Sequence, residues 1–145
     1  MRTELARCLG LLMFVLAFAA CAAAQQPSEE KLVREAVETY LHGLKFNDVE
    51  SFRKAFHPEA KLFFVKKDGS LGQLTQEQWY KGFEGSAGKE EEGELKIVAV
   101  DITGNAASVK VREEYPNSIY TDYVSLLKLG GAWKIVNKVY VAERK

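Results

Sequence analysis

The chain has 145 residues, with 20 basic and 20 acidic side chains and therefore no formal net charge. A hydrophobic content of 47% and 11% aromatic residues exclude general disorder and suit one domain with a core of its own. The absence of a basic surplus disfavours nucleic acid as a partner.

The first 24 residues have the pattern of an export signal. Two arginines precede an apolar run at 9–20 that is too short to span a membrane but typical of a signal peptide. Cleavage after Ala24 would leave residues 25–145 as one domain, periplasmic or secreted. Residues 18–21 also resemble a bacterial lipobox, so lipidation of Cys21 and attachment to the membrane is an alternative. The lack of caps and of a polar face disfavours a buried N-terminal helix.

Cysteines and histidines offer little for a metal site. Both cysteines, Cys8 and Cys21, lie in the predicted signal segment, so the exported domain has none to pair and relies on its core. His42 and His57 stand far apart without a zinc-binding motif, and we expect neither metal nor cofactor. His57 precedes Pro58 and could line the mouth of a pocket, although a histidine in this position more often makes a local hydrogen bond.

Two helices are predicted at the start of this domain. Ser28 can cap a helix in which apolar residues follow helical spacing as far as Leu44. A second, short helix begins at Asn47 or Asp48. It ends before Pro58, because the residue before proline avoids helical geometry.

A hairpin and a third helix follow. Asp68-Gly69 is a hairpin signal between predicted strands at 61–65 and 70–74. Thr75 and Gln78 form a capping box that opens the third helix.

The rest of the chain has a β pattern. Two-residue turn signals separate four predicted strands, which run at 94–103, 106–115, 119–129 and 132–141. Three helices before a meander of strands predict an α+β fold, with the helices packed on one face of a curved, mainly antiparallel sheet.

Two-residue turns fix the pairing of these strands. Val139 and Val111 are then both expected opposite Asp122, with Glu113 opposite Tyr120. The resulting inner face is apolar and comprises Val98, Val100, Ile102, Ala107, Val109, Val111, Val124, Leu126, Trp133, Ile135 and Val139.

Asp122 stands out on this apolar face. A carboxylate among valines is costly unless it is hydrogen-bonded or protonated, and such a group suits general acid–base work or contact with a ligand. Asn137 and Tyr120, expected nearby, could orient Asp122 or bind a polar group of a ligand. The alternative is structural: Asp122 caps a buried backbone group or ties a helix to the sheet.

Two further features concern partners. Tyr40 and Trp79 could form an aromatic wall for a flat ligand, or belong to an ordinary core. The predicted outer, convex sheet face mixes apolar side chains with Lys110, Lys134 and Lys138. That mixture suits a homodimer through this face, and ordinary partial exposure is the alternative.

Residues 120–139, together with 56–60 after the second helix, resemble the nuclear transport factor 2-like superfamily and its putative lumazine-binding branch. The resemblance implies a cone-shaped α+β fold, in which a curved sheet wraps a long helix around a pocket. Relatives include polyketide cyclases, a ketosteroid isomerase and a dehydratase, as well as binding and dimerisation modules. Asp122 is the position that the resemblance places in the pocket.

These observations leave three functions open. The first is an exported binding domain for a small apolar or aromatic ligand, with its pocket between the sheet and the first helix. The second is an isomerase- or cyclase-like enzyme with Asp122 as general base. The third is a dimeric envelope accessory domain without a ligand. The candidate ligand-binding residues are Asp122, Asn137, Tyr120, Tyr40, Trp79 and His57.

Overall fold

The computed structural model describes residues 27–145. The predicted signal peptide, its cleavage site after Ala24 and the possible lipidation of Cys21 lie outside the described residues. Within residues 27–145, none of the helices combines the length and the apolar character that crossing a membrane demands.

The helices precede most of the strands, as in the predicted order. The elements are α1 (Glu29–Phe46), α2 (Val49–Ala55), β1 (Phe56–Val65), β2 (Leu71–Thr75), α3 (Gln76–Tyr80), the 3-10 helix η1 (Glu84–Ser86), β3 (Glu94–Thr103), β4 (Ala106–Glu114), β5 (Ser118–Leu129) and β6 (Ala132–Arg144).

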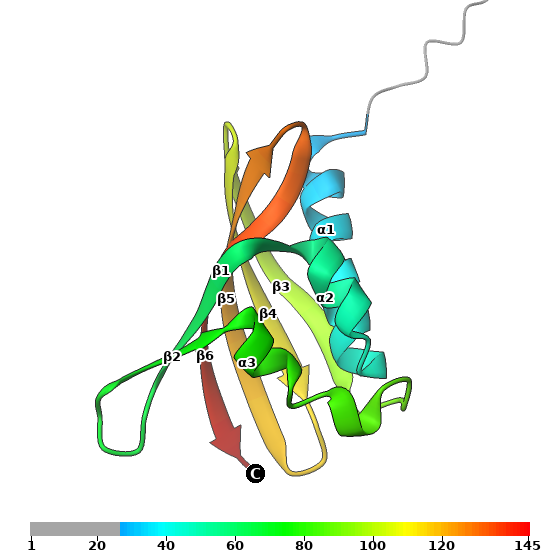
Figure 1. The fold of residues 1–145 in the computed structure, drawn as a ribbon. Coiled ribbons are helices and arrows are strands. Elements are labelled where there is room, and N and C mark those ends of the chain that lie inside the picture. The colour runs from blue at the N-terminus through cyan, green and yellow to red at the C-terminus, as the bar shows by residue number, and fades with distance from the viewer. Residues whose placement is uncertain (1–26) are drawn as a thin grey trace, which may run out of the picture.

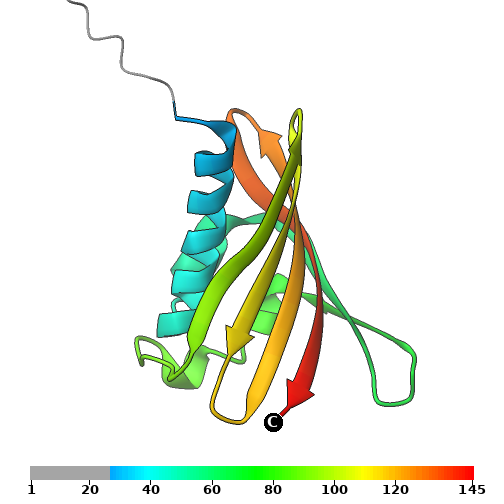
Figure 2. The ribbon, with the colours of Figure 1, turned by 180° about the vertical axis from the view of Figure 1, so that it is seen from behind.

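The strands of residues 27–145 form one six-stranded sheet in the order β2-β1-β6-β5-β4-β3. Only β1 and β6 run parallel; every other neighbouring pair is antiparallel. Figures 1 and 2 show α1 and α2 against one face of the strongly curved sheet, with α3 near its lower end. The predicted α+β class, with three helices on a curved and mainly antiparallel sheet, is confirmed.

The long helix α1 begins and ends at residues suited to these positions. The Ser28 hydroxyl accepts a hydrogen bond from the Lys31 backbone N–H, which satisfies one of the donors left open at a helix start. At the other end Asn47 adopts a left-handed conformation, φ 53°, and its N–H bonds to the Gly43 carbonyl. The helix buries one stripe of side chains in the core, namely Val33, Val37, Tyr40 and Leu44.

Strand β1 starts earlier than predicted. It begins at Phe56, directly after α2, rather than at residue 61, and Phe56 pairs with Ile135 of β6. The parallel contact between β1 and β6 joins the β1–β2 hairpin to the meander of later strands. The two predicted β regions are therefore one sheet.

The pairing of β4 with β5 agrees with the register predicted from the turns. Val111 lies opposite Asp122, and Glu113 lies opposite Tyr120. Most of the predicted inner face is buried as expected, including Ala107, Val109, Val111, Val124, Leu126, Trp133 and Ile135.

A bulge in β6 overturns the prediction for the end of the last hairpin. Leu126 pairs with Ile135 but Ser125 pairs with Asn137, which leaves Val136 as an extra residue in β6. An extra residue reverses the faces of everything that follows it.

Beyond the bulge, Lys138 lies opposite Val124 and is buried, whereas Val139 pairs with Tyr123 and is 47% exposed. Tyr140, not Val139, faces Asp122. The prediction is therefore wrong at three positions. It placed Val139 and Asn137 on the inner face of the sheet and Lys138 on the outer face.

A second bulge, in β3, corrects the other edge of the inner face. Ile97 pairs with Val111 and Ala99 with Lys110, so Val98 has no partner and is 48% exposed. Ile97 packs against the core in its place. The predicted inner position of Val98 is wrong because the curvature of the sheet requires bulges, which two-residue turns do not reveal.

Candidate functional site

Four polar side chains meet inside the cone, and we call them the buried polar cluster: Tyr40, Glu113, Asp122 and Lys138. They come from α1, β4, β5 and β6. The Lys138 Nζ lies 2.7 Å from Asp122 Oδ2 and donates to the Tyr40 hydroxyl at 2.6 Å. Tyr40 in turn donates to Asp122 and lies 3.1 Å from Glu113 Oε1. The cluster joins the helix to three neighbouring strands.

Aromatic packing holds Tyr40 in place. Its ring centroid lies 5.3 Å from that of Phe56 in an edge-on arrangement, and 6.2 Å from those of Phe52 and Trp79. These separations are typical of stabilising aromatic pairs. The hydroxyl, at the polar end of a fully buried side chain, can reach only the other members of the cluster.

Burial decides the protonation of Glu113 and Tyr40. Burial away from water is the largest cause of the raised pKa of Glu113, and the nearby charge of Asp122 is the next. Together they raise this pKa from 4.5 to about 8, against the opposing effect of Lys138. Burial, and after it the charge of Asp122, raises the pKa of Tyr40 well above its usual value. At neutral pH both side chains therefore keep their protons. The ion pair of Lys138 and Asp122 then leaves the cluster without net charge.

One buried oxygen of Asp122 lacks a hydrogen-bond donor that a protonated Glu113 can supply. Asp122 Oδ1 is buried, and no fixed N–H or O–H donor of the described residues bonds to it. A buried acceptor without a partner is costly. Hydrogen bonding to Asp122 contributes to the raised pKa of Glu113, and a protonated Glu113 supplies the missing donor. The other side of Glu113 accepts a hydrogen bond from Tyr115 at 3.2 Å.

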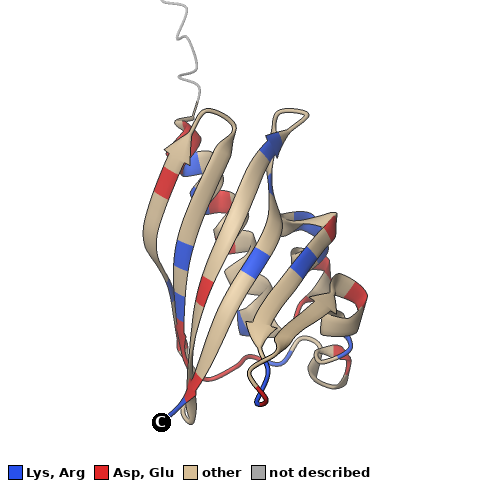
Figure 3. Cartoon of the chain, turned by 90° about the vertical axis from the view of Figure 1, so that its left-hand side faces the viewer, with Lys and Arg blue, Asp and Glu red and all other residues tan. Residues whose placement is uncertain are grey.

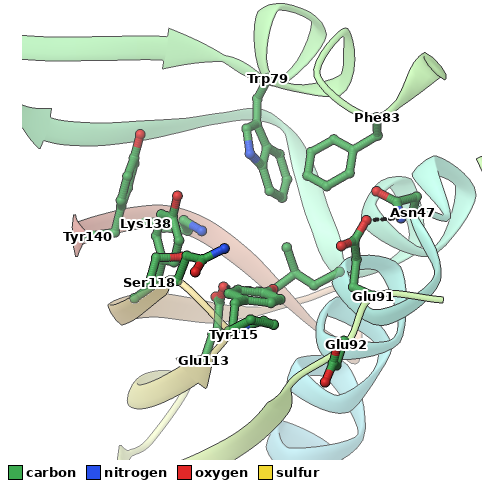
Figure 4. Close-up of a pocket in the computed structure, with 14 residues that line it drawn as sticks. Asn47, Trp79, Phe83, Glu91, Glu92, Glu113, Tyr115, Ser118, Lys138 and Tyr140 are labelled. Atoms are coloured by element: carbon green, nitrogen blue, oxygen red, sulfur yellow. Dashed lines mark hydrogen bonds between the residues drawn. The ribbon is translucent and has the colours of Figure 1, made fainter. Parts of the chain in front are cut away.

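A pocket of about 520 Å³ opens next to the cluster. Figure 4 shows Trp79 and Phe83 on one wall, Tyr140 and Lys138 on another, and Glu113 and Tyr115 at its base. The complete lining is Leu44, Asn47, Trp79, Phe83, Glu91, Glu92, Glu113, Tyr115, Pro116, Asn117, Ser118, Tyr120, Lys138 and Tyr140. Only Glu113 and Lys138 belong both to the pocket wall and to the buried polar cluster.

The predicted site residues fall into three groups. Trp79 and Tyr120 line the pocket. Tyr40 and Asp122 lie behind its wall, where they contact Lys138. Asn137 pairs with Ser125 beyond the bulge and does not line the pocket.

His57 is also outside the pocket lining. Its ring accepts a hydrogen bond from the Glu59 backbone N–H, and its carbonyl accepts one from Gln76. His57 thus makes local hydrogen bonds, which is the alternative to a position at the mouth of the pocket.

Several pocket residues were absent from the predicted site. The bulge at Val136 hid Lys138 and Tyr140, because regular alternation places both on the outer face. Glu113 was visible in the sequence as the partner of Tyr120, but no signal in the strand pattern placed it next to Tyr40. Among residues 27–145, no three or more histidine, cysteine or acidic side chains are grouped to hold a metal ion.

Comparison with known proteins agrees with this architecture. Residues 28–141 match the model of a family described as putative lumazine-binding. The chain belongs to this family. An NTF2-like protein of unknown function from Shewanella baltica OS155 is similar in structure, with a TM-score of 0.74 and 27% identity over 81% of this chain and 95% of that one.

Two further proteins extend the comparison. An NTF2-like protein of unknown function from Methylobacillus flagellatus KT has a TM-score of 0.68 and 26% identity, covering 81% of this chain and 96% of that one. A protein named aldolase FrzH, from Cladobotryum sp, is 24% identical over 119 residues, which cover 78% of this chain and 90% of that protein. The resemblance to NTF2-like proteins of the putative lumazine-binding family is thus confirmed.

The protonated state of Glu113 makes stability depend on pH in an unusual window. Unfolding returns Glu113 to water and its pKa to the ordinary 4.5. Between pH 4.5 and about 8 the folded protein therefore holds this proton more strongly than the unfolded chain. The free energy of unfolding should fall as the pH rises through this window, by on the order of 4 kcal/mol. Urea unfolding at pH 5 and pH 8.5 measures the change.

The variant Glu113→Gln, which is neutral at every pH, should lose most of this decline. Glu114→Gln is the matched control, because a hydrogen bond from Arg112 lowers the pKa of Glu114 and confines its effect to more acidic pH. An equally steep decline in Glu113→Gln would contradict a protonated Glu113.

Proposed function

We propose that the chain binds a small, flat, neutral molecule that carries a carbonyl oxygen. Lys138 at the pocket wall is the observation that carries this proposal. An ammonium group has three hydrogen-bond donors, and two of them bond to Asp122 and Tyr40. The third is available to an acceptor in the pocket.

The lining supports a flat and uncharged ligand. Trp79, Phe83, Tyr115, Tyr120 and Tyr140 contribute aromatic surface, which favours stacking on a conjugated ring. Glu91 and Glu92 also line the pocket, and their carboxylates oppose the entry of an anion. A pocket of this size is ordinary for small ligands, which disfavours the hypothesis of a ligand-free accessory domain.

Binding should be visible in the fluorescence of one tryptophan. Trp79 lines the pocket, whereas Trp133 donates a hydrogen bond to Glu29 at 2.8 Å and does not. Lumazine, a flat heterocycle with two carbonyl groups, should quench the emission of the protein and release heat in calorimetry. Trp79→Phe should lose the quenching and Trp133→Phe should keep it. If lumazine, flavins and aromatic ketones all produce neither heat nor quenching, the proposal is refuted.

A second candidate function is an enzyme that moves a proton at the carbon next to a carbonyl group. Two observations favour it: Glu113 can exchange a proton at the pocket wall, and a relative at 24% identity is named an aldolase. Asp122, the base expected from the sequence, is not among the lining residues. In this hypothesis Glu113 is the base, and Lys138 stabilises the oxygen of the enolate.

Solvent exchange tests this enzymatic hypothesis. Acetophenone in D₂O should lose its methyl proton signal in NMR faster with the protein than without it. The rate should rise as the pH passes about 8, because only ionised Glu113 accepts a proton. Glu113→Gln should lower it at least about a hundredfold, whereas Glu114→Gln should not. Exchange that survives in Glu113→Gln would assign the base elsewhere.

We also propose that the chain is exported, with residues 1–24 as signal peptide. The arginines before the apolar run at 9–20 and the small residues before Gln25 support this. Lipidation at Cys21 stays the alternative, in which case the domain is held at a membrane by its N-terminus.

We further propose that the outer face of the sheet pairs with a second copy of the chain. Figure 3 views the sheet from this side, with charged residues interspersed among uncharged ones along the strands. Tyr123, Leu127, Val139 and Val141 of the neighbouring strands β5 and β6 are each at least 40% exposed. Exposed apolar patches mark interfaces, and a two-fold axis would place the same patch on both copies.

Sedimentation measures this association. We expect a dimer at high micromolar concentration and a monomer for Val139→Glu, which places a charge in the centre of the apolar surface. Lys66→Glu, in the turn between β1 and β2, is the control and should leave the dimer intact. A wild-type protein that stays monomeric at this concentration would end the proposal.

A further inference from the structure

Lys138 is the only lysine in the described residues that is buried, and it nevertheless reaches the pocket. Its Nζ lies 5.1 Å from the ring centroids of Tyr40 and Trp79, and 4.9 Å from that of Tyr140. Figure 4 shows its side chain among those of the lining residues. A ligand stacked on Trp79 would therefore lie beside a primary amine.

The neighbours of Lys138 can handle the protons of a reaction at nitrogen. An amine must lose a proton before it attacks carbon, and Asp122 Oδ2 lies 2.7 Å from the Nζ. A carbonyl oxygen must gain protons before it leaves as water. Glu113 lines the same pocket and holds a proton at neutral pH. A proton acceptor therefore contacts the amine, and a proton donor lines the same pocket.

We propose that Lys138 forms an imine with an aldehyde or ketone that carries an aromatic or conjugated group. This inference rests on the proposed binding of carbonyl compounds in the pocket. It adds that the contact between lysine and carbonyl becomes covalent.

The steps balance without a further reactant. Lys138 gives a proton to Asp122, and rotation about the Cε–Nζ bond turns the nitrogen lone pair toward the pocket. The nitrogen attacks the carbonyl carbon while Glu113 protonates the oxygen, which forms a carbinolamine. The nitrogen returns a proton to Glu113, which passes it to the hydroxyl group so that this group leaves as water and a protonated imine remains. Asp122 then gives Glu113 the proton that it took from Lys138, across the hydrogen bond between the two side chains, and is ionised again. Overall an ammonium and a carbonyl give an iminium and water.

The burial of Lys138 favours this chemistry over the same reaction at the surface. Exposed lysines form imines that water readily reverses, and nothing holds the carbonyl against them. At Lys138 the aromatic walls orient the carbonyl group. The ion pair with Asp122 survives because an iminium is also a cation, so imine formation leaves no buried charge unpaired.

Reductive trapping tests the proposal on the full chain. The protein is incubated at neutral pH with one equivalent of benzaldehyde and with cyanoborohydride, and the product is analysed by intact mass and peptide mapping. We expect one adduct per chain, equal to benzaldehyde less its oxygen, on Lys138. It should form at least about tenfold faster than an adduct on any other lysine. Adducts spread over exposed lysines, without Lys138, would overturn the proposal.

Variants separate chemistry from folding. Lys138→Arg keeps the positive charge next to Asp122 but should not trap benzaldehyde. The double variant Lys138→Met with Asp122→Asn removes both charges together and should also be unreactive. Lys134→Met, on the outer part of β6, should react like the wild type. Continued trapping at the wild-type rate in Lys138→Arg would refute the assignment.

Binding without reductant distinguishes this inference from the proposed function. If benzaldehyde quenches Trp79 but no adduct forms on Lys138, the imine is refuted and the binding site stands. If the aldehyde neither quenches nor reacts, and the wider panel of carbonyl compounds also fails to bind, both proposals fall.

Discussion

The ion pair of Lys138 and Asp122 is the interaction on which the interior depends. Both side chains are almost completely buried, with the Nζ 2.7 Å from Oδ2. Removing one partner would leave a charge inside the protein without compensation, which is far more costly than losing the pair as a whole. Tyr40 contacts both charges, so the position of α1 on the sheet is coupled to the same pair.

The bulge at Val136 makes this pair possible. Without the extra residue, Lys138 would pair with Tyr123 and point outward, Asn137 would take its place opposite Val124, and Val139 would lie opposite Asp122. Asp122 would then lack its cation. A bulge bends a strand and turns its side chains over, and here it curves the sheet around α1 while bringing one lysine inside. Curvature of the sheet and chemistry of the pocket therefore have a common origin in β6.

The sequence predicts those parts of the site that follow regular alternation. Asp122 on the inner face, with Val111 and Val124 around it, follows from two-residue turns and the two-residue period of a strand. Lys138 and Tyr140 do not, because no residue at positions 132–141 signals the bulge. Nor does local pattern show that β1 joins β6, since a parallel contact between segments so distant in sequence depends on the tertiary fold.

The fold alone does not select a function, because the same architecture serves binding and catalysis alike. What distinguishes this pocket is that Glu113 and Lys138 belong to both its wall and the buried polar cluster. A ligand that contacts either side chain changes the electrostatics of all four cluster members, since Tyr40 and Asp122 have no other polar partners among the described residues. Recognition of a ligand is thereby coupled to proton positions inside the core. Under the proposed function, this coupling accounts for the presence of such costly groups at the centre of a domain whose other buried contacts are largely apolar.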